Sequence, residues 1–255
     1  MHKVEWEIVS DIPSFVDGKL FLFKIDLTEG FDESAIPFSS DLTSTELERC
    51  HKYRFHKDRV RFSVGRYTVR HLLKSYLPDH DKEIEFQFNV YGKPNVDQVC
   101  DIRFNISHSG KYLLIGICKQ YEVGVDTEKH NSTIDHLDLA KSVFSEMEQA
   151  TLAKLSLEER IRGFYRCWSM KESVIKAVGI GLQLPLDQFT VDLTSTNSQN
   201  HLLSIPWSPQ LMNVIKTRVV HIDENYSAAY TCHQSIDEVY HFDLTAQLTH
   251  SEEKL

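Results

Sequence analysis

Three acidic side chains and a lysine stand at spacings that suit a divalent cation holding a phosphate group. Asp126 and Glu128 lie two residues apart in the segment 123–128, Val-Gly-Val-Asp-Thr-Glu, which the sequence predicts as a strand. Side chains two apart on a strand share a face, with Cα atoms roughly 6–7 Å apart. Two carboxylates at this distance repel each other unless a cation lies between them. Mg²⁺ prefers oxygen ligands. The pair therefore predicts a magnesium site.

The third carboxylate lies about forty residues later, in a predicted helix that includes 168–176, Trp-Ser-Met-Lys-Glu-Ser-Val-Ile-Lys. Apolar residues such as Tyr165 and Ile175 recur at helical spacing and mark its buried side. Glu172 falls on the same line, so its charge must be neutralised, paired or bound to a metal. Lys176, one turn further, offers a simpler alternative, a Glu–Lys helix pair worth a few tenths of a kcal/mol. Taken with the strand pair, the metal interpretation is favoured.

The overall charge argues against a general nucleic-acid binder, because the 255 residues carry a net charge of −9. The basic residues are nevertheless concentrated. Nine Lys or Arg and a single acid, Asp58, lie between Arg49 and Lys74. Most of that run must form a solvated face, but its concentration also indicates a local anion site.

Cysteine usage and the lack of targeting patterns indicate a cytoplasmic protein. The five cysteines are odd in number and contain no CxxC pair, which fits a reducing compartment. The N-terminus has no signal-peptide pattern, and no apolar run approaches the length of a membrane span. We therefore expect no membrane partner.

The pattern of elements predicts an α+β architecture with two similar halves. Predicted helices start at 43 and cover 57–77, 137–155 in two pieces, and 158–178; predicted strands cover 19–27, 84–90, the hairpin 103–118, 123–128, 187–193, 201–205, 213–220 and 226–232. We expect an N-terminal subdomain at 1–122 with the basic segment, a C-terminal subdomain at 123–245 with the acidic residues, and a tail at 246–255.

Two further residues have a structural and a functional interpretation. His108 lies beside the hairpin turn, where its ring could bond nearby backbone or contact an anion close to the metal strand. Lys93, in Tyr-Gly-Lys-Pro, could be a plain exposed turn lysine or could cover a flat ligand ring. The sequence alone leaves both pairs of alternatives open.

At this point the motifs resemble a known family. The segments 123–128 and 168–176 are similar in sequence, order and spacing to the signature pair of 4′-phosphopantetheinyl transferases. Supporting motifs are Tyr-Gly-Lys-Pro at 91–94, Phe-Asn-Ile-Ser-His-Ser-Gly at 104–110, and Gly-Ile-Gly-Leu at 179–182 followed by Pro-Leu at 185–186. The length and layout resemble the larger, surfactin-synthetase-activating class, a single-chain pseudo-dimer of two α/β subdomains.

The resemblance implies a reaction and a set of roles. Coenzyme A would donate its phosphopantetheine to a serine of an apo acyl or peptidyl carrier protein, releasing adenosine 3′,5′-bisphosphate. It implies Mg²⁺ ligands at Asp126, Glu128 and Glu172. Catalysis would involve Asp126, Lys176 on the pyrophosphate, and Glu172, which would also serve as base for the serine. Coenzyme A would be held by Arg49, Arg61, Lys93, Ser107, His108 and Lys176.

Some positions fit the family less well. Phe62 stands where the resemblance predicts a small hydroxyl residue, and Lys171 matches the motif without a role. Without the resemblance, the carboxylates would suit another Mg²⁺-dependent phosphotransferase or phosphatase equally well. A coenzyme A binding protein without activity is the other alternative, but it predicts a broken metal set, whereas all three carboxylates are present. Two halves in one chain predict a monomer. An acidic carrier would dock on basic surface near the cleft, with Arg66 and Arg70 as test positions.

Overall fold

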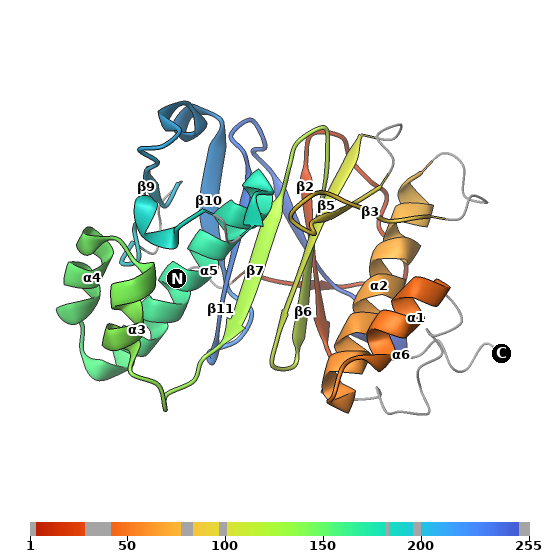
Figure 1. Ribbon diagram of the computed structural model, residues 1–255. Helices are drawn as coiled ribbons and strands as arrows, with labels where there is room; N and C mark the ends of the chain where they lie inside the picture. The colour runs from red at the N-terminus through yellow and green to blue at the C-terminus, as the bar shows by residue number, and fades with distance from the viewer. Residues whose placement is uncertain are drawn as a thin grey trace.

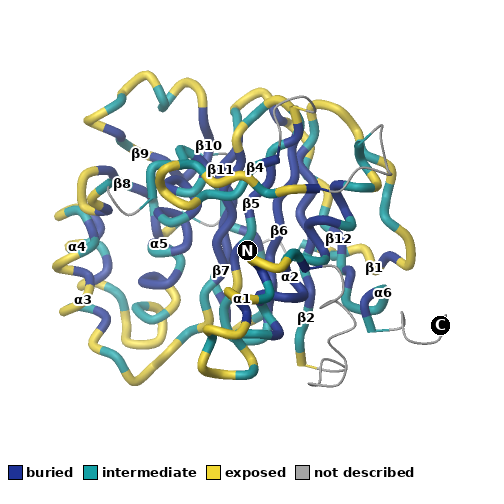
Figure 2. The backbone as a smooth tube through the Cα atoms, turned by 45° about the vertical axis from the view of Figure 1, so that its right-hand side comes forward, coloured by how far each residue is buried: buried dark blue, intermediate teal, exposed yellow. Residues whose placement is uncertain are grey.

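Two β-sheets meet at the centre of the molecule, and helices cover the outer side of each (Figure 1). The computed structural model describes residues 4–28, 42–77, 84–96, 101–181, 184–195 and 200–249. The strands at the centre are its most buried part (Figure 2). The predicted α+β arrangement with two α/β halves is therefore confirmed. Within the described ranges, no helix combines the length and apolar character needed to cross a bilayer.

The first half is a five-stranded sheet with helices on one face. Its strand order is β1 (Glu7–Ile8), β12 (Val239–Asp243), β2 (Leu20–Asp26), β6 (Tyr112–Lys119) and β5 (Ile102–Ser109). The helices are α1 (Ser44–His51), α2 (His56–Tyr76) and α6 (Thr245–Thr249). A capping box between Thr43 and Glu46 begins α1, as the sequence predicts.

Strand β2 is buried on both faces, which explains its continuous apolar sequence. Phe21, Phe23 and Ile25 pack in the same core as residues of α2 such as Leu72. Leu20 and Leu22 belong to a second core that contains Val125 and other residues of the opposite sheet. The two halves are thus joined by a shared apolar layer between their sheets.

The second half is a three-stranded antiparallel sheet, β10 (Ile215–Val220), β11 (Tyr226–His233) and β7 (Gly124–Lys129). Helix α5 (Leu157–Val178) packs on it, beside α3 (His136–Val143) and α4 (Glu146–Ala153). A capping box at Ser156 begins α5, and Gly179 ends it in the left-handed conformation with φ of 77°. Two short strands, β8 (Thr190–Val191) and β9 (Leu202–Ser204), complete this half.

Some elements differ from the prediction. The predicted strand 84–90 shrinks to β3 (Gln87–Phe88), paired with β4 (Pro94–Asn95), and 187–193 begins with a 3-10 turn at Leu186–Gln188. Strand β12 is not predicted, and it pairs in parallel with β2 of the first half. Helix α6 occupies part of the predicted tail, whose remainder lies outside the described residues. The division into subdomains at residue 122 stays a prediction.

Candidate functional site

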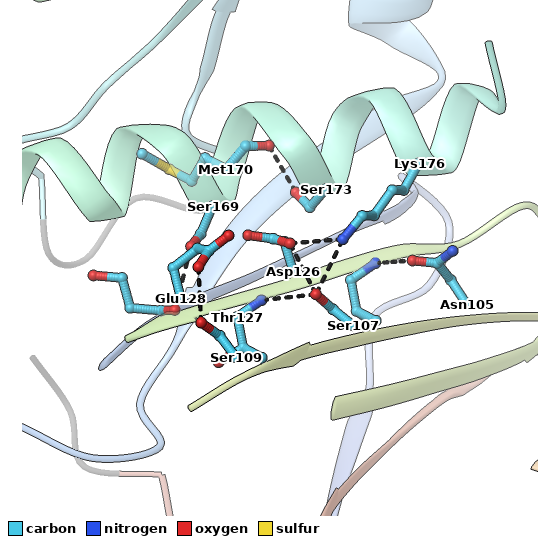
Figure 3. A network of polar contacts seen from close by, with 12 residues as sticks. Asn105, Ser107, Ser109, Asp126, Thr127, Glu128, Ser169, Met170, Ser173 and Lys176 are labelled. Carbon is cyan, nitrogen blue, oxygen red and sulfur yellow. Dashed lines mark hydrogen bonds and ion pairs between the residues drawn. The ribbon is translucent and has the colours of Figure 1, made fainter. Parts of the chain in front are cut away.

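The two open sheet edges, β5 of the first half and β7 of the second, face each other at the joint of the molecule. Three side chains of β5 bond backbone N–H groups of β7 in place of a partner strand, and Figure 3 draws these bonds for Asn105 and Ser107. Asn105 Oδ1 accepts from Val125 at 2.9 Å, Ser107 Oγ from Thr127 at 3.4 Å, and Ser109 Oγ from Lys129 at 3.0 Å. We call Asn105, Ser107 and Ser109 the polar seam. These side chains accept hydrogen bonds from N–H groups at the edge of β7 that would otherwise lack a partner strand.

Asp126 lies at the middle of this seam and is only 2% exposed. Its Oδ1 accepts from Lys176 Nζ at 2.6 Å and from Ser107 Oγ at 2.9 Å (Figure 3). Lys176 Nζ also lies 3.0 Å from Ser107 Oγ. The alternative of a simple Glu172–Lys176 ion pair is not the contact that the structure shows, because Lys176 pairs with Asp126 across the helix–strand interface.

Glu128 and Glu172 are the other acidic groups of the site. Ser109 Oγ donates to Glu128 Oε2 at 2.9 Å. Burial and the neighbouring Asp126 charge raise the pKa of Glu128 to about 7, against the opposing hydrogen bond from Ser109. Burial also raises the pKa of Glu172; Lys176 opposes that rise and Asp126 adds to it. Like charges therefore gather in this site, and a bound cation would relieve the part of their repulsion that Lys176 does not.

The donor set fits a magnesium ion that shares its coordination with a substrate. Asp126 Oδ2 is buried and has no hydrogen-bond partner among the described residues. Within those residues the carboxylates do not form a complete cage of three ligands. Mg²⁺ keeps waters and is usually bound by one or two carboxylates with substrate phosphates, so a site here would need such further ligands. Asp126 and Glu128, both oxygen donors on one face of β7, are the residues nearest to that description.

A glycine brings α5 close enough to β7 for this arrangement. A Cβ at Gly124 would lie 2.0 Å from the Ser173 carbonyl oxygen and 2.4 Å from the Ala177 nitrogen, both helix backbone. The buried Ser173 hydroxyl also bonds Thr231 Oγ1 at 2.8 Å on β11. Small residues on both surfaces thus let the helix present Glu172 and Lys176 to the strand.

Lys171 has a structural contact rather than a place in the acidic site. Its fully buried Nζ pairs with Glu148 at 2.9 Å and donates to the carbonyls of Leu186 and Phe189. Glu148 in turn accepts from the Val191 N–H at 2.7 Å. The motif lysine therefore fastens α5 to α4 and to the segment that leads into β8.

Two predicted phosphate-binding residues lie at the β5–β6 turn. Arg61 on α2 donates to the Gly110 carbonyl and pairs with Asp58 at 2.8 Å. His108 is the next-to-last residue of β5, and desolvation of its ring lowers its pKa, with Arg61 and Lys176 adding to the effect. Both residues therefore border the acidic site from the first half.

Lys93 is neither a free surface lysine nor in the acidic site. Its Nζ pairs with Glu122 at 2.5 Å and donates to the Val123 carbonyl at 3.2 Å, just before β7. It lines a cavity of about 230 Å³ together with Arg103 and Gly179. The structure thus places Lys93 next to an open space at the Gly124 end of the seam.

The two arginines named as test positions for carrier docking are largely occupied inside the first half: Arg70 is buried and Arg66 is half-buried, so docking on exposed basic surface stays a prediction that does not rest on them. Arg70 pairs with Glu46 of α1 at 2.9 Å, and Arg66 Nε lies 3.7 Å from the same carboxylate. Phe62 is also buried, with the guanidinium of Arg49 5.6 Å and that of Arg66 5.5 Å from its ring centre. Part of the concentrated positive charge is therefore paired with Glu46 inside the first half. Arg49, which is predicted to bind coenzyme A, is exposed.

Fold and site together define an α/β protein with a cluster of carboxylates between its two halves, bordered by basic residues, an arrangement that suits a phosphorylated substrate bound with a divalent cation.

Comparison with known proteins supplies the family. The sequence model of the 4′-phosphopantetheinyl transferase superfamily matches residues 122–231, and that of a 4′-phosphopantetheinyl transferase N-terminal region matches 34–120. The 4′-phosphopantetheinyl transferase Sfp of Bacillus subtilis is 36% identical over 61% of this chain and 68% of its own length. HetI of Nostoc sp. is 31% identical over 76% of this chain and 83% of its own length.

A mammalian relative is more distant. The L-aminoadipate-semialdehyde dehydrogenase-phosphopantetheinyl transferase of Mus musculus is 29% identical over 60% of this chain and 53% of its own. The chain belongs to the 4′-phosphopantetheinyl transferase superfamily, whose members move 4′-phosphopantetheine from coenzyme A to carrier proteins. This membership decides between the enzymatic alternatives that the carboxylates alone leave open.

Proposed function

We propose that Asp126, Glu128 and Glu172 hold Mg²⁺ and that Lys176 contacts the pyrophosphate of coenzyme A during the transfer. The observation that carries this proposal is the buried Asp126 carboxylate, which is paired with Lys176 on one oxygen and has no hydrogen-bond partner on the other within the described part of the chain. A buried carboxylate oxygen without a hydrogen bond costs free energy unless a ligand satisfies it. The roles of all four residues rest on this arrangement.

The chemistry needs a base, charge neutralisation and alignment. The Oγ of the acceptor serine attacks the phosphorus that carries the pantetheine arm. The bond from that phosphorus to the bridging oxygen breaks, and adenosine 3′,5′-bisphosphate leaves with the electron pair. Glu172 accepts the serine proton directly or through a water, and its raised pKa brings it closer to the working range of a general base. Lys176 neutralises phosphate oxygens, and bound Mg²⁺ supplies further charge neutralisation.

Basic residues of both halves complete the coenzyme A site. In the proposal, Lys93, Ser107 and His108 hold the adenine and 3′-phosphate end, while Arg49 and Arg61 lie along the phosphates. The contacts of Arg61 and His108 at the β5–β6 turn, and the cavity beside Lys93, support this assignment. The acceptor is an apo acyl or peptidyl carrier protein. A monomeric state and a cytoplasmic location complete the proposal.

The roles are tested by transfer onto an apo carrier, measured as the gain of one phosphopantetheine in its intact mass. Glu172→Gln and Lys176→Met should each lower the initial rate by at least about 10²-fold, the usual contribution of a base or charge-stabilising group. Lys93→Met should raise the KM for coenzyme A and leave kcat nearly unchanged. Lys141→Ala, on the exposed surface of α3, is the control for loss of a lysine. Wild-type rates in Glu172→Gln would contradict the catalytic assignment.

A further inference from the structure

Each residue of the polar seam accepts a hydrogen bond from a backbone N–H of β7, but only the two serines also bond a carboxylate. Asn105, Ser107 and Ser109 point to the same side of β5, and each accepts one N–H from β7. A serine hydroxyl that accepts an N–H still has its own proton to donate, whereas the Asn105 oxygen has none. The two serines are therefore able to do more than join the sheets.

Each serine gives that proton to an acidic residue of β7. Ser107 donates to Asp126 Oδ1 and Ser109 donates to Glu128 Oε2, both at 2.9 Å (Figure 3). The carboxylate in each case immediately precedes the residue whose N–H the same serine accepts. One hydroxyl thus fixes both the position of the strand and the direction of the side chain beside it.

We infer that Ser109 is a positioning residue for Glu128, and that the first half of the protein thereby sets the metal affinity of the second. The inference rests on the proposed role of Glu128 as a metal ligand. A glutamate has three rotatable side-chain bonds, and the hydrogen bond from Ser109 is the one described contact that fixes its carboxylate. Partners of this kind orient metal ligands, and their loss typically weakens metal affinity by about 10- to 100-fold.

The chain offers matched variants for the test. Ser109→Ala removes the donor to Glu128 and the acceptor for the Lys129 N–H. Asn105→Ala removes an equivalent seam bond, to the Val125 N–H, without a contact to either carboxylate. Ser109→Thr keeps the hydroxyl on a branched side chain that a strand accommodates. Ser109→Cys keeps the size of the side chain but is a weak donor, and it replaces the alanine variant should that variant not fold.

The measurement is Mn²⁺ binding to the full chain in the presence of adenosine 3′,5′-bisphosphate, followed by electron paramagnetic resonance of free Mn²⁺, with the melting temperature recorded in parallel. We expect Ser109→Ala to raise the Kd for Mn²⁺ about tenfold. Ser109→Thr should stay within about twofold of the wild type, because it keeps the donor that aims the carboxylate. Asn105→Ala should lower the melting temperature and leave the Kd unchanged.

Two results would overturn the inference. One is an unchanged Kd in both Ser109→Ala and Ser109→Cys; the other is an equal loss of affinity in Asn105→Ala, which would make the effect one of general loosening. Glu128→Gln separates this failure from that of the proposed metal site. If Glu128→Gln weakens Mn²⁺ binding and Ser109→Ala does not, only the positioning role fails. If Glu128→Gln binds like the wild type, the ligand assignment fails and the inference fails with it.

Discussion

The approach of α5 to β7 depends on a single missing Cβ, and Gly124→Ala tests how closely activity follows it. The new Cβ would lie 2.0 Å from the Ser173 carbonyl oxygen, where ordinary contact begins at 3.4 Å. The backbone of a helix cannot rotate away, so the helix must retreat by about 1.4 Å, the difference between these distances. The 2.6 Å contact between Lys176 Nζ and Asp126 Oδ1 would then exceed hydrogen-bond distance.

A displacement of this size should affect activity more than stability. Misplacing reacting groups by about 1 Å can cost about 10²-fold in rate. Overpacking a core typically costs about 1–3 kcal/mol, and each kcal/mol shifts the melting temperature of a chain this size by about 2–4 °C. We therefore expect Gly124→Ala to fold and to transfer phosphopantetheine about 10²-fold more slowly at saturating coenzyme A, measured by the intact mass of the carrier.

Gly163→Ala on the same helix is the matched control. Its Cβ would lie 2.9 Å from Leu155 Cδ1, the flexible end of a side chain, and helix propensity favours alanine by about 1 kcal/mol. This variant should keep the wild-type rate. Gly124→Ala with more than half the wild-type rate would refute the reasoning, since the helix position would then not control the site.

Two further predictions concern buried charge. Lys171→Met leaves Glu148 buried without its counter-charge and should lower the free energy of unfolding by about 3–5 kcal/mol in urea titrations. Adding Glu148→Gln should restore much of that loss, and a loss below about 1 kcal/mol for the single variant would contradict the role of the pair. Burial lowers the pKa of His241 to about 4. Because the unfolded histidine binds its proton near pH 6.5, the free energy of unfolding should fall by up to about 3 kcal/mol as pH decreases from 6.5 to 4. His241→Gln should flatten that slope in denaturation curves, and an unchanged slope would assign the acid sensitivity to other groups.

Local periodicity was enough to predict which side chains of one element share a face. Asp126 and Glu128 alternate on β7, and Glu172 and Lys176 follow one turn apart on α5, as expected. The partner of Lys176 was not predictable in this way, because Asp126 is fifty residues away in sequence. Lys176 pairs with Asp126 rather than with Glu172 because of how closely the helix packs on the strand, and periodicity carries no information about that distance.

Non-local pairing explains the other differences. The side chains of Arg66 and Arg70 count as surface charge in a composition analysis, but Glu46 of α1 lies opposite them in the folded protein. Strand β12 is five residues long and pairs with β2, more than two hundred residues earlier. The sequence carries a weak signal for the polar seam, because Asn-x-Ser-x-Ser in a predicted strand places three polar side chains on one face.

The seam also explains why the site lies at this joint. Two strands paired through their backbones lie about 4.8 Å apart and leave no polar side chain between them. Here β5 reaches β7 only through the side chains of Asn105, Ser107 and Ser109, which must hold the strands further apart. The N–H groups at the edge of β7 are hydrogen-bonded, and the apolar core between the sheets stays buried. The serine hydroxyls remain beside the carboxylates. Direct backbone pairing of β5 with β7 would make the sheet more regular, but it would remove the donors that orient Asp126 and Glu128. The incomplete pairing of the two halves is therefore the feature that allows an active site between them.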